Sequence, residues 1–266
     1  MILAADNLQI LQPAIFDAVK KDNPEPIQDL VRRCVTAGAQ AIDINSGPLR
    51  REPERKFAFL VEAVQSVTSL PLLLDTINPR ALQAGLKVCR NRAIINGFSL
   101  EPARLEHVLP LAAAHEAEII GYLLSPDGRI PDDEAEMMAL AVSLFEAATA
   151  KGVPAERLII DPVVAPMSWE NGVKHNQAVL STIHHLPDLL DARVCTIAGV
   201  SNLGAGQPSA DRRIALESAF LPMLASAGLE IALLNIFHQP TLRVARTCET
   251  LLSQKVFSWA TLGDPA

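Results

Sequence analysis

The sequence predicts a (β/α)8 TIM barrel, an α/β fold in which eight parallel strands alternate with eight helices. Short aliphatic runs alternate with longer amphipathic segments from one end of the 266 residues to the other. Eight such pairs in a chain of this length are typical of the barrel. No low-complexity linker or change in composition divides the chain. We therefore expect one barrel domain over residues 1–266.

The strands are predicted from short runs rich in Ile, Leu, Val and Ala, which is the pattern of parallel strands buried on both faces. In order along the chain they cover residues 2–4, 41–44, 72–74, 93–95, 119–124, 158–160, 195–198 and 231–234. A doubly wound sheet is the alternative fold. It would favour a G-x-G-x-x-G or G-x-x-x-x-G-K-[ST] loop after an early strand, and the sequence has neither.

The helices are predicted where apolar residues recur at helical spacing between the strands. In order they cover residues 26–37, 52–68, 79–88, 102–115, 132–151, 175–186, 209–227 and 241–253. Pro or Asp often stands near their starts, and Gly38, Gly152 and Gly228 follow three of them. These residues are typical of helix beginnings and ends respectively.

Composition excludes several classes of function. The chain has 23 Lys and Arg against 30 Asp and Glu, a net charge of −7, and no basic run, so nucleic acid is not an expected partner. The mean hydropathy is +0.22, but no apolar run approaches the roughly 20 residues of a membrane span. With no signal-like start, we expect a cytoplasmic protein.

The four cysteines and six histidines do not indicate a metal site. The cysteines are far apart in the sequence and are expected to be buried free thiols. No group of histidines and cysteines has zinc-site spacing, so we expect no metal. His238, after the last predicted strand, is the only histidine expected at the mouth of the barrel.

Polar residues end five of the predicted strands, where barrel enzymes carry their chemistry. Any one of these residues could simply cap a helix or form a turn. Together, at one end of a barrel, they predict a binding site. The runs are Asp43-Ile44-Asn45-Ser46-Gly47-Pro48, Asp75-Thr76-Ile77-Asn78, Asn96-Gly97, Asp161-Pro162 and Gly199-Val200-Ser201-Asn202.

The residue types at these strand ends indicate the chemistry of the ligand. Carboxylates accept hydrogen bonds from N–H groups, and Asn both donates and accepts. Because Lys, Arg and His are nearly absent from the runs, a phosphorylated substrate is a poor fit. A neutral heterocycle with an amino-pyrimidinone edge fits well.

In this order the motifs resemble those of the pterin-binding methyltransferases, and most of all methyltetrahydrofolate:corrinoid/iron–sulfur protein methyltransferase and its tetrahydrofolate-dependent relatives. The resemblance runs along almost the full chain. It implies the pterin-binding type of barrel, also found in dihydropteroate synthase. By position it assigns the pterin to Asp75, Asn96 and Asp161 and places Asn202 at N5 of the folate; Ser201, Asp43 and Asn45 complete the predicted pterin site.

The resemblance implies methyl transfer between N5 of tetrahydrofolate and the cobalt of a corrinoid, in either direction, as part of one-carbon metabolism. The substrate is then tetrahydrofolate or 5-methyltetrahydrofolate. The chain has no D-x-H-x-x-G sequence, so the cobamide is expected on a separate corrinoid protein. A homodimer is also implied.

Asn202 has a specific expected role. A tertiary amine leaves poorly, so N5 needs a proton or a strong hydrogen bond during the transfer. An amide is not an acid near neutral pH. We therefore expect Asn202 to donate a hydrogen bond that strengthens in the transition state, with the proton coming from solvent.

Three segments depart from the family pattern. The first strand ends Ala5-Asp6-Asn7-Leu8-Gln9 where close relatives have a Glu-Arg-Ile-Asn-like run. The residues after Asn202, 203–207, lack the usual polar side chains, and Leu234-Asn235-Ile236-Phe237-His238 is less acidic than in relatives. These changes could alter the partner or the reaction direction.

Two other functions remain as alternatives. A dihydropteroate synthase shares the barrel and the pterin pocket, but it would need a basic run after the seventh strand for pyrophosphate, where this chain has Ser201-Asn202-Leu203. A non-catalytic folate-binding protein would keep the pocket without the reaction. Asn202 weighs against that reading, whereas the altered loops leave it open.

Overall fold

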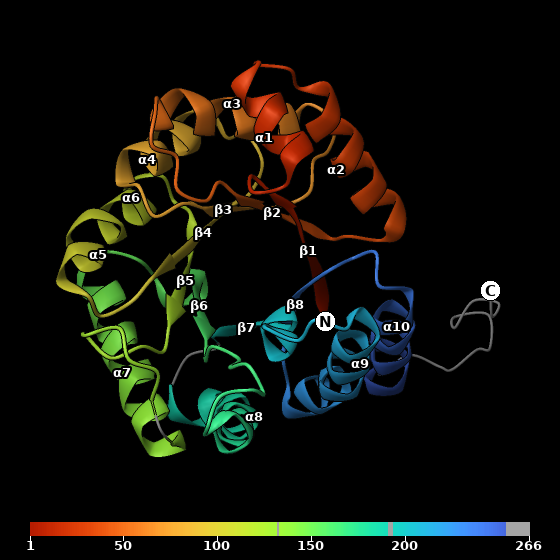
Figure 1. Cartoon of the computed structure of the whole chain (residues 1–266). Helices are drawn as coiled ribbons and strands as arrows, with labels where there is room; N and C mark the ends of the chain where they lie inside the picture. Colours follow the sequence, from red (N-terminus) through yellow and green to blue (C-terminus); the bar gives the residue numbers. More distant parts are fainter. Residues whose placement is uncertain (132, 191–193, 254–266) are drawn as a thin grey trace.

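The computed structural model describes residues 1–131, 133–190 and 194–253. Within them, parallel strands pair in chain order from β1 to β8 and close into a barrel, with the helices outside it (Figure 1). This confirms the predicted fold. The strands are β1 (Ile2–Gln9), β2 (Ala41–Asn45), β3 (Leu72–Asp75), β4 (Ala93–Phe98), β5 (Glu118–Tyr122), β6 (Leu158–Asp161), β7 (Cys195–Gly199) and β8 (Ile231–Leu234).

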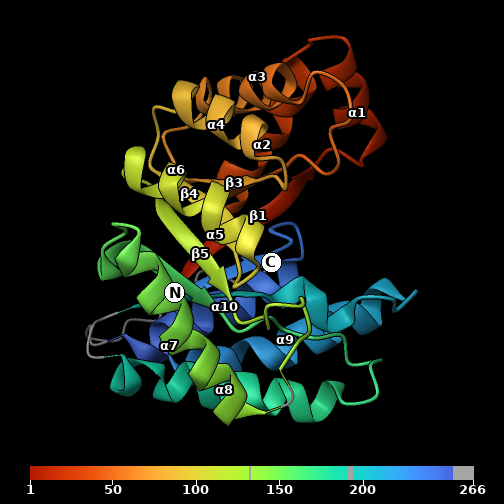
Figure 2. The ribbon, with the colours of Figure 1, turned by 90° about the vertical axis from the view of Figure 1, so that its left-hand side faces the viewer.

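The helices form an outer ring, with α3 and α4 on one side of the barrel and α8 and α9 on the opposite side (Figure 2). None of the helices in the described residues is long and apolar enough to cross a membrane. They are α1 (Pro13–Lys20), α2 (Glu25–Ala37), α3 (Pro53–Gln65), α4 (Pro79–Val88), α5 (Pro102–His107), α6 (Leu109–Ala114), α7 (Glu134–Ala150), α8 (Gly172–Leu189), α9 (Ala210–Ala227) and α10 (Gln239–Leu252), with 3-10 turns η1 (Ala155–Arg157) and η2 (Val200–Gly204).

An apolar layer fills the interior of the barrel near the start of the strands. It takes one side chain from each strand, and each is at most 3% exposed. Because side chains alternate between the two faces of a strand, these residues point inward together. The layer consists of Ala4, Ala41, Leu73, Ile94, Ile120, Ile159, Ile197 and Ile231. We call it the floor.

A polar layer follows the floor toward the ends of the strands. On β1 to β6 the next inward position, two residues beyond the floor residue, carries a polar side chain. The register of the parallel pairs keeps these strand ends at one end of the barrel, which we call the mouth. The polar residues are Asp6, Asp43, Asp75, Asn96, Tyr122 and Asp161.

Local signals in the sequence explain several helix boundaries. Asn78 caps α4, because its side-chain oxygen accepts from the backbone N–H groups of Arg80 and Ala81. Gly38 and Gly228 end α2 and α9 with φ values of 105° and 107°, a left-handed conformation that glycine adopts without strain. These two predicted helix ends are confirmed.

Some predicted bounds were wrong. The first strand extends to Gln9 rather than ending at residue 4, because the strand continues through the polar residues Asp6 and Asn7 beyond the aliphatic run. The helix α1 was not predicted. The predicted helix 102–115 is two helices, α5 and α6, that meet at Val108, and Pro110 lies in the first turn of α6, where a missing N–H is tolerated. Asp132, the predicted start of another helix, lies outside the described residues.

All four cysteines are free, as predicted. Cys34 and Cys248 are buried, whereas Cys89 and Cys195 are only partly buried.

Candidate functional site

The amide of Asn96, at the end of β4, is held on two sides. Its Nδ2 donates to Asp43 Oδ1 over 3.1 Å, and the hydroxyl of Tyr122 donates to its Oδ1. Because one side of an amide donates and the other accepts, these two partners fix which way the group faces. One N–H and one lone pair of Asn96 remain for a ligand.

A second pair of predicted residues lies beside it. Asn45 donates from Nδ2 to Asp75 Oδ2 over 2.6 Å, and its own Oδ1 accepts from the backbone N–H of Gly47 over 3.0 Å. Burial raises the pKa of Asp75 to about 6, although the positive charge of Arg104, on α5, partly opposes this effect. Asp75 is therefore an acceptor that ionises only as the pH approaches neutrality.

Asp161, at the end of β6, is oriented by the backbone. Its Oδ1 accepts from the N–H of Val163 over 2.8 Å, and Val163 has a φ of 63°, which is rare for a β-branched residue. The buried ring of His175 lies with Nε2 2.8 Å from Val163 O and Nδ1 3.1 Å from Pro131 O. Burial raises the pKa of Asp161 to about 7.

Asp43 and Tyr122 are enclosed by the same cluster. Burial, and after it the charge of Asp75, raises the pKa of Asp43 well above its ordinary value. Burial and the charges of Asp75 and Asp161 do the same to the pKa of Tyr122. The cluster therefore disfavours further negative charge, and a ligand that brings N–H donors would relieve it.

Ser201 and Asn202 lie in η2, directly after β7. The Ser201 hydroxyl donates to Asp6 Oδ2 over 2.6 Å. Asn202 is exposed beside Gly199, and within the residues that the structure describes its side chain makes no hydrogen bond. Of the predicted site residues, Asn202 is thus the one with its whole amide available.

The end of β1, one of the segments that depart from the family pattern, is hydrogen-bonded to the loop after β8. Asn7 donates from Nδ2 to Asn235 Oδ1 over 2.7 Å and accepts from the N–H of Ile236 over 2.9 Å. Just beyond, His238 Nδ1 lies 3.1 Å from Oε2 of Glu217, a buried residue of α9. Asn7 therefore joins β1 to the loop after β8.

The structure thus brings Asp43 next to Asn96 and Asn45 next to Asp75 by direct hydrogen bonds. Ser201 instead donates to Asp6, which was not among the predicted site residues. The missed residues of the mouth are Asp6, Tyr122 and Arg104. The alternation of inward and outward side chains could have identified the first two, since each lies two residues after a floor residue.

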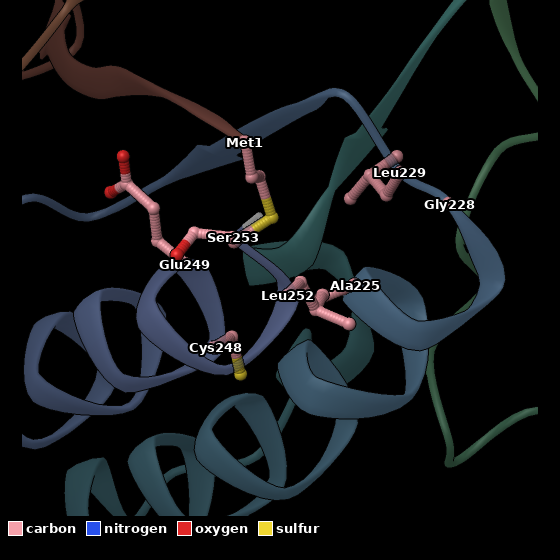
Figure 3. Close-up of a pocket in the computed structure, with 8 residues that line it drawn as sticks. All are labelled: Met1, Ala225, Gly228, Leu229, Cys248, Glu249, Leu252 and Ser253. Carbon is pink, nitrogen blue, oxygen red and sulfur yellow. The ribbon is translucent and has the colours of Figure 1, made fainter. Parts of the chain in front are cut away.

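A cavity of about 430 Å³ lies at the opposite end of the barrel and does not share this chemistry. Figure 3 shows Met1, at the start of β1, facing Leu252 and Ser253 at the end of α10. Its other lining residues are Ala225, Gly228, Leu229, Cys248 and Glu249. The acceptors for a polar heterocycle are at the mouth.

Comparison with known proteins gives relatives of two kinds. Residues 12–235 match the family described as "Pterin binding enzyme". Over 239 residues the chain is 24% identical to a methylcorrinoid:tetrahydrofolate methyltransferase of Eubacterium limosum, covering 88% of this chain and 85% of that protein. It is also 23% identical to methionine synthase of Mycobacterium tuberculosis over 231 residues, which are 82% of this chain but 19% of that longer protein.

Solved structures share the fold at low identity. Dihydropteroate synthase from Thermus thermophilus superposes with a TM-score of 0.69 at 20% identity, over 94% of each chain. The enzyme from Xanthomonas albilineans in complex with 7,8-dihydropteroate gives a TM-score of 0.68 at 20% identity, over 96% of this chain and 94% of that one. With a family match over most of its length and a barrel mouth lined by carboxylates and amides, the chain belongs to the pterin-binding enzyme family.

Proposed function

We propose that this protein is a methyltransferase that moves a methyl group between N5 of tetrahydrofolate and the cobalt of a corrinoid held by a separate protein. The observation that carries the proposal is Asn202, exposed directly after β7 with an uncommitted amide, at the same end of the barrel as an acceptor cluster suited to a pterin. The Eubacterium limosum relative, by its name, acts on a methylcorrinoid and tetrahydrofolate.

The acceptor cluster fits the pterin in chemical terms. The amino-pyrimidinone edge offers N–H donors, which Asp75 and Asp161 accept once ionised. Asn96, fixed by Asp43 and Tyr122, presents one donor and one acceptor to the ring. Asn45 orients the Asp75 carboxylate, and Ser201 lies on the side of Asn202. This set holds the heterocycle in one orientation.

Asn202 supports the reaction by binding the transition state more strongly than the ground state. Negative charge and basicity develop on N5 as its methyl group departs, and a hydrogen bond from the Asn202 amide strengthens accordingly. The corrinoid, when its carrier docks at the mouth, supplies the cobalt that takes or gives the methyl group. Which direction operates depends on that partner.

A dihydropteroate synthase activity is less well supported. Such an enzyme expels pyrophosphate and requires free cations near η2. Residues 200–207 contain no Lys or Arg. Arg213, which lies against Gly204, donates to the backbone carbonyl of Gln207 over 2.6 Å. The likeness to dihydropteroate synthase structures is one of fold.

The test is a spectroscopic methyl-transfer assay in both directions. One arm combines cob(I)alamin with 5-methyltetrahydrofolate, and the other combines methylcobalamin with tetrahydrofolate. We expect Asn202→Ala to slow the transfer about 100-fold or more, with folate affinity changed less than about fivefold, the size of one ordinary hydrogen bond. The exposed Asn23→Ala is the matched control and should match the unaltered chain.

The other outcomes separate the alternatives. Equal losses of rate and affinity in Asn202→Ala would contradict its assigned role. Tight folate binding without transfer, even with corrinoid carrier proteins present, would favour the non-catalytic reading. Formation of dihydropteroate from its precursors would favour the synthase. An absence of folate binding would overturn the pterin site itself.

We further propose that residues 1–266 act as one domain and as a cytoplasmic homodimer. A small apolar groove of about 220 Å³ between α8 and α9 supports a contact with a second copy. Val173 and Met223 line it and are 55% and 50% exposed. Exposed apolar side chains gathered in one groove are typical of protein contacts.

A further inference from the structure

The proposed transfer requires a proton at N5. When the methyl group leaves, N5 keeps the electron pair of the broken bond, so it becomes a neutral secondary amine only if it takes up one proton. The amide of Asn202 is not an acid near neutral pH. Asp75 and Asp161 are engaged, under the proposed function, as acceptors for the pterin. The proton must therefore come from solvent or from another group at the mouth.

Asp6 lies beside the turn that carries Asn202. It is the inward-facing residue of β1 two positions beyond Ala4 of the floor. Its Oδ2 is 2.6 Å from the hydroxyl of Ser201, the residue that precedes Asn202 in η2. A hydroxyl both donates and accepts, so Ser201 can pass a proton between a carboxyl group and a third group.

Charged and titratable groups from the neighbouring elements surround Asp6. The pKa of Asp6 is raised above the ordinary 3.8, and burial is the largest cause. The charge of Glu217, on α9, also raises this pKa. The hydrogen bond from Ser201 and the charge of His238 act in the opposite direction. Asp43 of β2 and Cys34 of α2 also lie within reach of its charge. A carboxyl group in these surroundings keeps its proton to a higher pH than an ordinary aspartate does, as an acid near neutrality must.

We propose that Asp6 is the acid of the methyl transfer and gives its carboxyl proton to N5 through the hydroxyl of Ser201. The bond between N5 and the methyl carbon breaks, and N5 keeps that electron pair and takes the proton. Cobalt supplies the pair for its new bond to the methyl carbon. Asp6 is left as a carboxylate, which solvent reprotonates.

In the opposite direction the same groups exchange roles. The Asp6 carboxylate takes the N5 proton as N5 attacks the methyl group. This inference rests on the proposed function, and in it a side chain gives the proton that the sequence led us to expect directly from solvent.

The experiment is a set of single-turnover rates from pH 5.5 to 8.5 with free cobalamin, in whichever direction the unaltered protein turns over fastest. For transfer away from N5, the rate should fall as the pH rises past the apparent pKa of Asp6. Asp6→Asn should be slower by about 100-fold or more, the usual contribution of a positioned acid, and should lack that falling limb. Asp6→Glu should retain a falling limb.

Ser201→Ala gives a readout that a structural role would not move. It removes the hydroxyl that passes the proton, so the rate should fall about as far as in Asp6→Asn. It also removes the hydrogen bond that lowers the pKa of Asp6, so any falling limb that remains should shift to higher pH. The matched control is Ser181→Ala, which removes a serine–carboxylate hydrogen bond of the same 2.6 Å length, to Glu134, on α8. Its pH profile should match that of the unaltered chain.

The remaining outcomes are distinct. An Asp6→Asn variant that keeps the unaltered rate and pH profile would overturn this inference and leave the proposed function standing. Equal losses of folate affinity and rate would do the same, since they indicate a structural role. If Asp6→Asn fails to fold, Ser201→Ala decides: an unaltered rate and pH profile in that variant would overturn this inference. A chain without folate binding or methyl transfer would overturn both proposals.

Discussion

The ionisation of Asp161 connects the binding site to the stability of the fold. Burial raises the pKa of this carboxyl group from an ordinary 3.8 to about 7. Between these two values the folded chain holds a proton that the unfolded chain has released. The free energy of unfolding therefore decreases as the pH rises from about 4 to about 7. The raised pKa values of Asp75 and Asp43 act in the same direction.

Asp161→Asn should remove the loss of folding stability that arises from ionising this buried carboxyl group. We expect the variant to be more stable than the unaltered chain by up to about 4 kcal/mol at pH 8, from about 1.4 kcal/mol per unit of pKa shift. The difference should shrink toward pH 5. Urea unfolding at several pH values measures it, with the exposed Asp211→Asn as the control. A difference independent of pH would contradict the ionisation argument.

For single residues, the sequence predicted which side chains lie at the mouth better than it predicted their hydrogen-bond partners. Asp75, Asn96 and Asp161 could be placed at the mouth because each directly follows an aliphatic run. The partners of these residues could not be predicted, because contacts such as Asp43–Asn96 and Asn45–Asp75 depend on the register of strands that pair only in the closed barrel. Tyr122 was counted as part of a buried strand, and its hydroxyl contact with Asn96 depends on the tilt of neighbouring strands in the closed barrel.

The start of α8 contacts the candidate site through the backbone. A carbonyl oxygen only accepts hydrogen bonds, and both ring nitrogens of His175 face one. A neutral ring therefore donates to either Val163 or Pro131, and a protonated ring to both. In both states the ring connects α8 to at least one of two loops, the loop after β5 through Pro131 or the loop after β6 through Val163. The N–H of Val163 in turn donates to Asp161.

His175→Ala should therefore weaken both the fold and the site. We expect a loss of about 2–3 kcal/mol in the free energy of unfolding, from a removed buried hydrogen bond and lost packing. Folate affinity should fall several-fold, because Val163 no longer orients Asp161. Calorimetry of unfolding and of folate binding tests this. His184→Ala, exposed on the same helix, should change neither; unchanged affinity in His175→Ala would remove His175 from the site.

Elements were predictable where periodicity and end signals agreed. Residues 79–88 were predicted as a helix with the bounds that α4 has, because Asn78 and Pro79 mark its start and apolar residues recur at helical spacing. The first strand was predicted too short because Asp6 and Asn7 interrupt the apolar pattern. In the barrel those residues meet Ser201 and Asn235, which are about two hundred positions away in the sequence.

At the scale of the whole molecule, the groove between α8 and α9 gives a test of assembly. We expect sedimentation to give twice the chain mass of 28.6 kDa. Met223→Glu places a charge in the apolar groove and should shift the protein toward the monomer. Leu251→Glu, 76% exposed on α10, is the control and should remain a dimer. A monomer at every concentration of the unaltered chain would contradict the proposed assembly.

The number and order of strands followed from the sequence because each unit is local, whereas closure of the barrel depends on all of them together. Among the described residues, the closed barrel and its filled floor leave the polar layer facing the mouth. Under the proposed function, a pterin bound against the polar layer and a large protein docking at the strand ends would share this opening. The folate would then have to arrive before the carrier protein and depart after it. We therefore expect an excess of carrier to slow folate exchange, because the barrel itself would set the order of encounter.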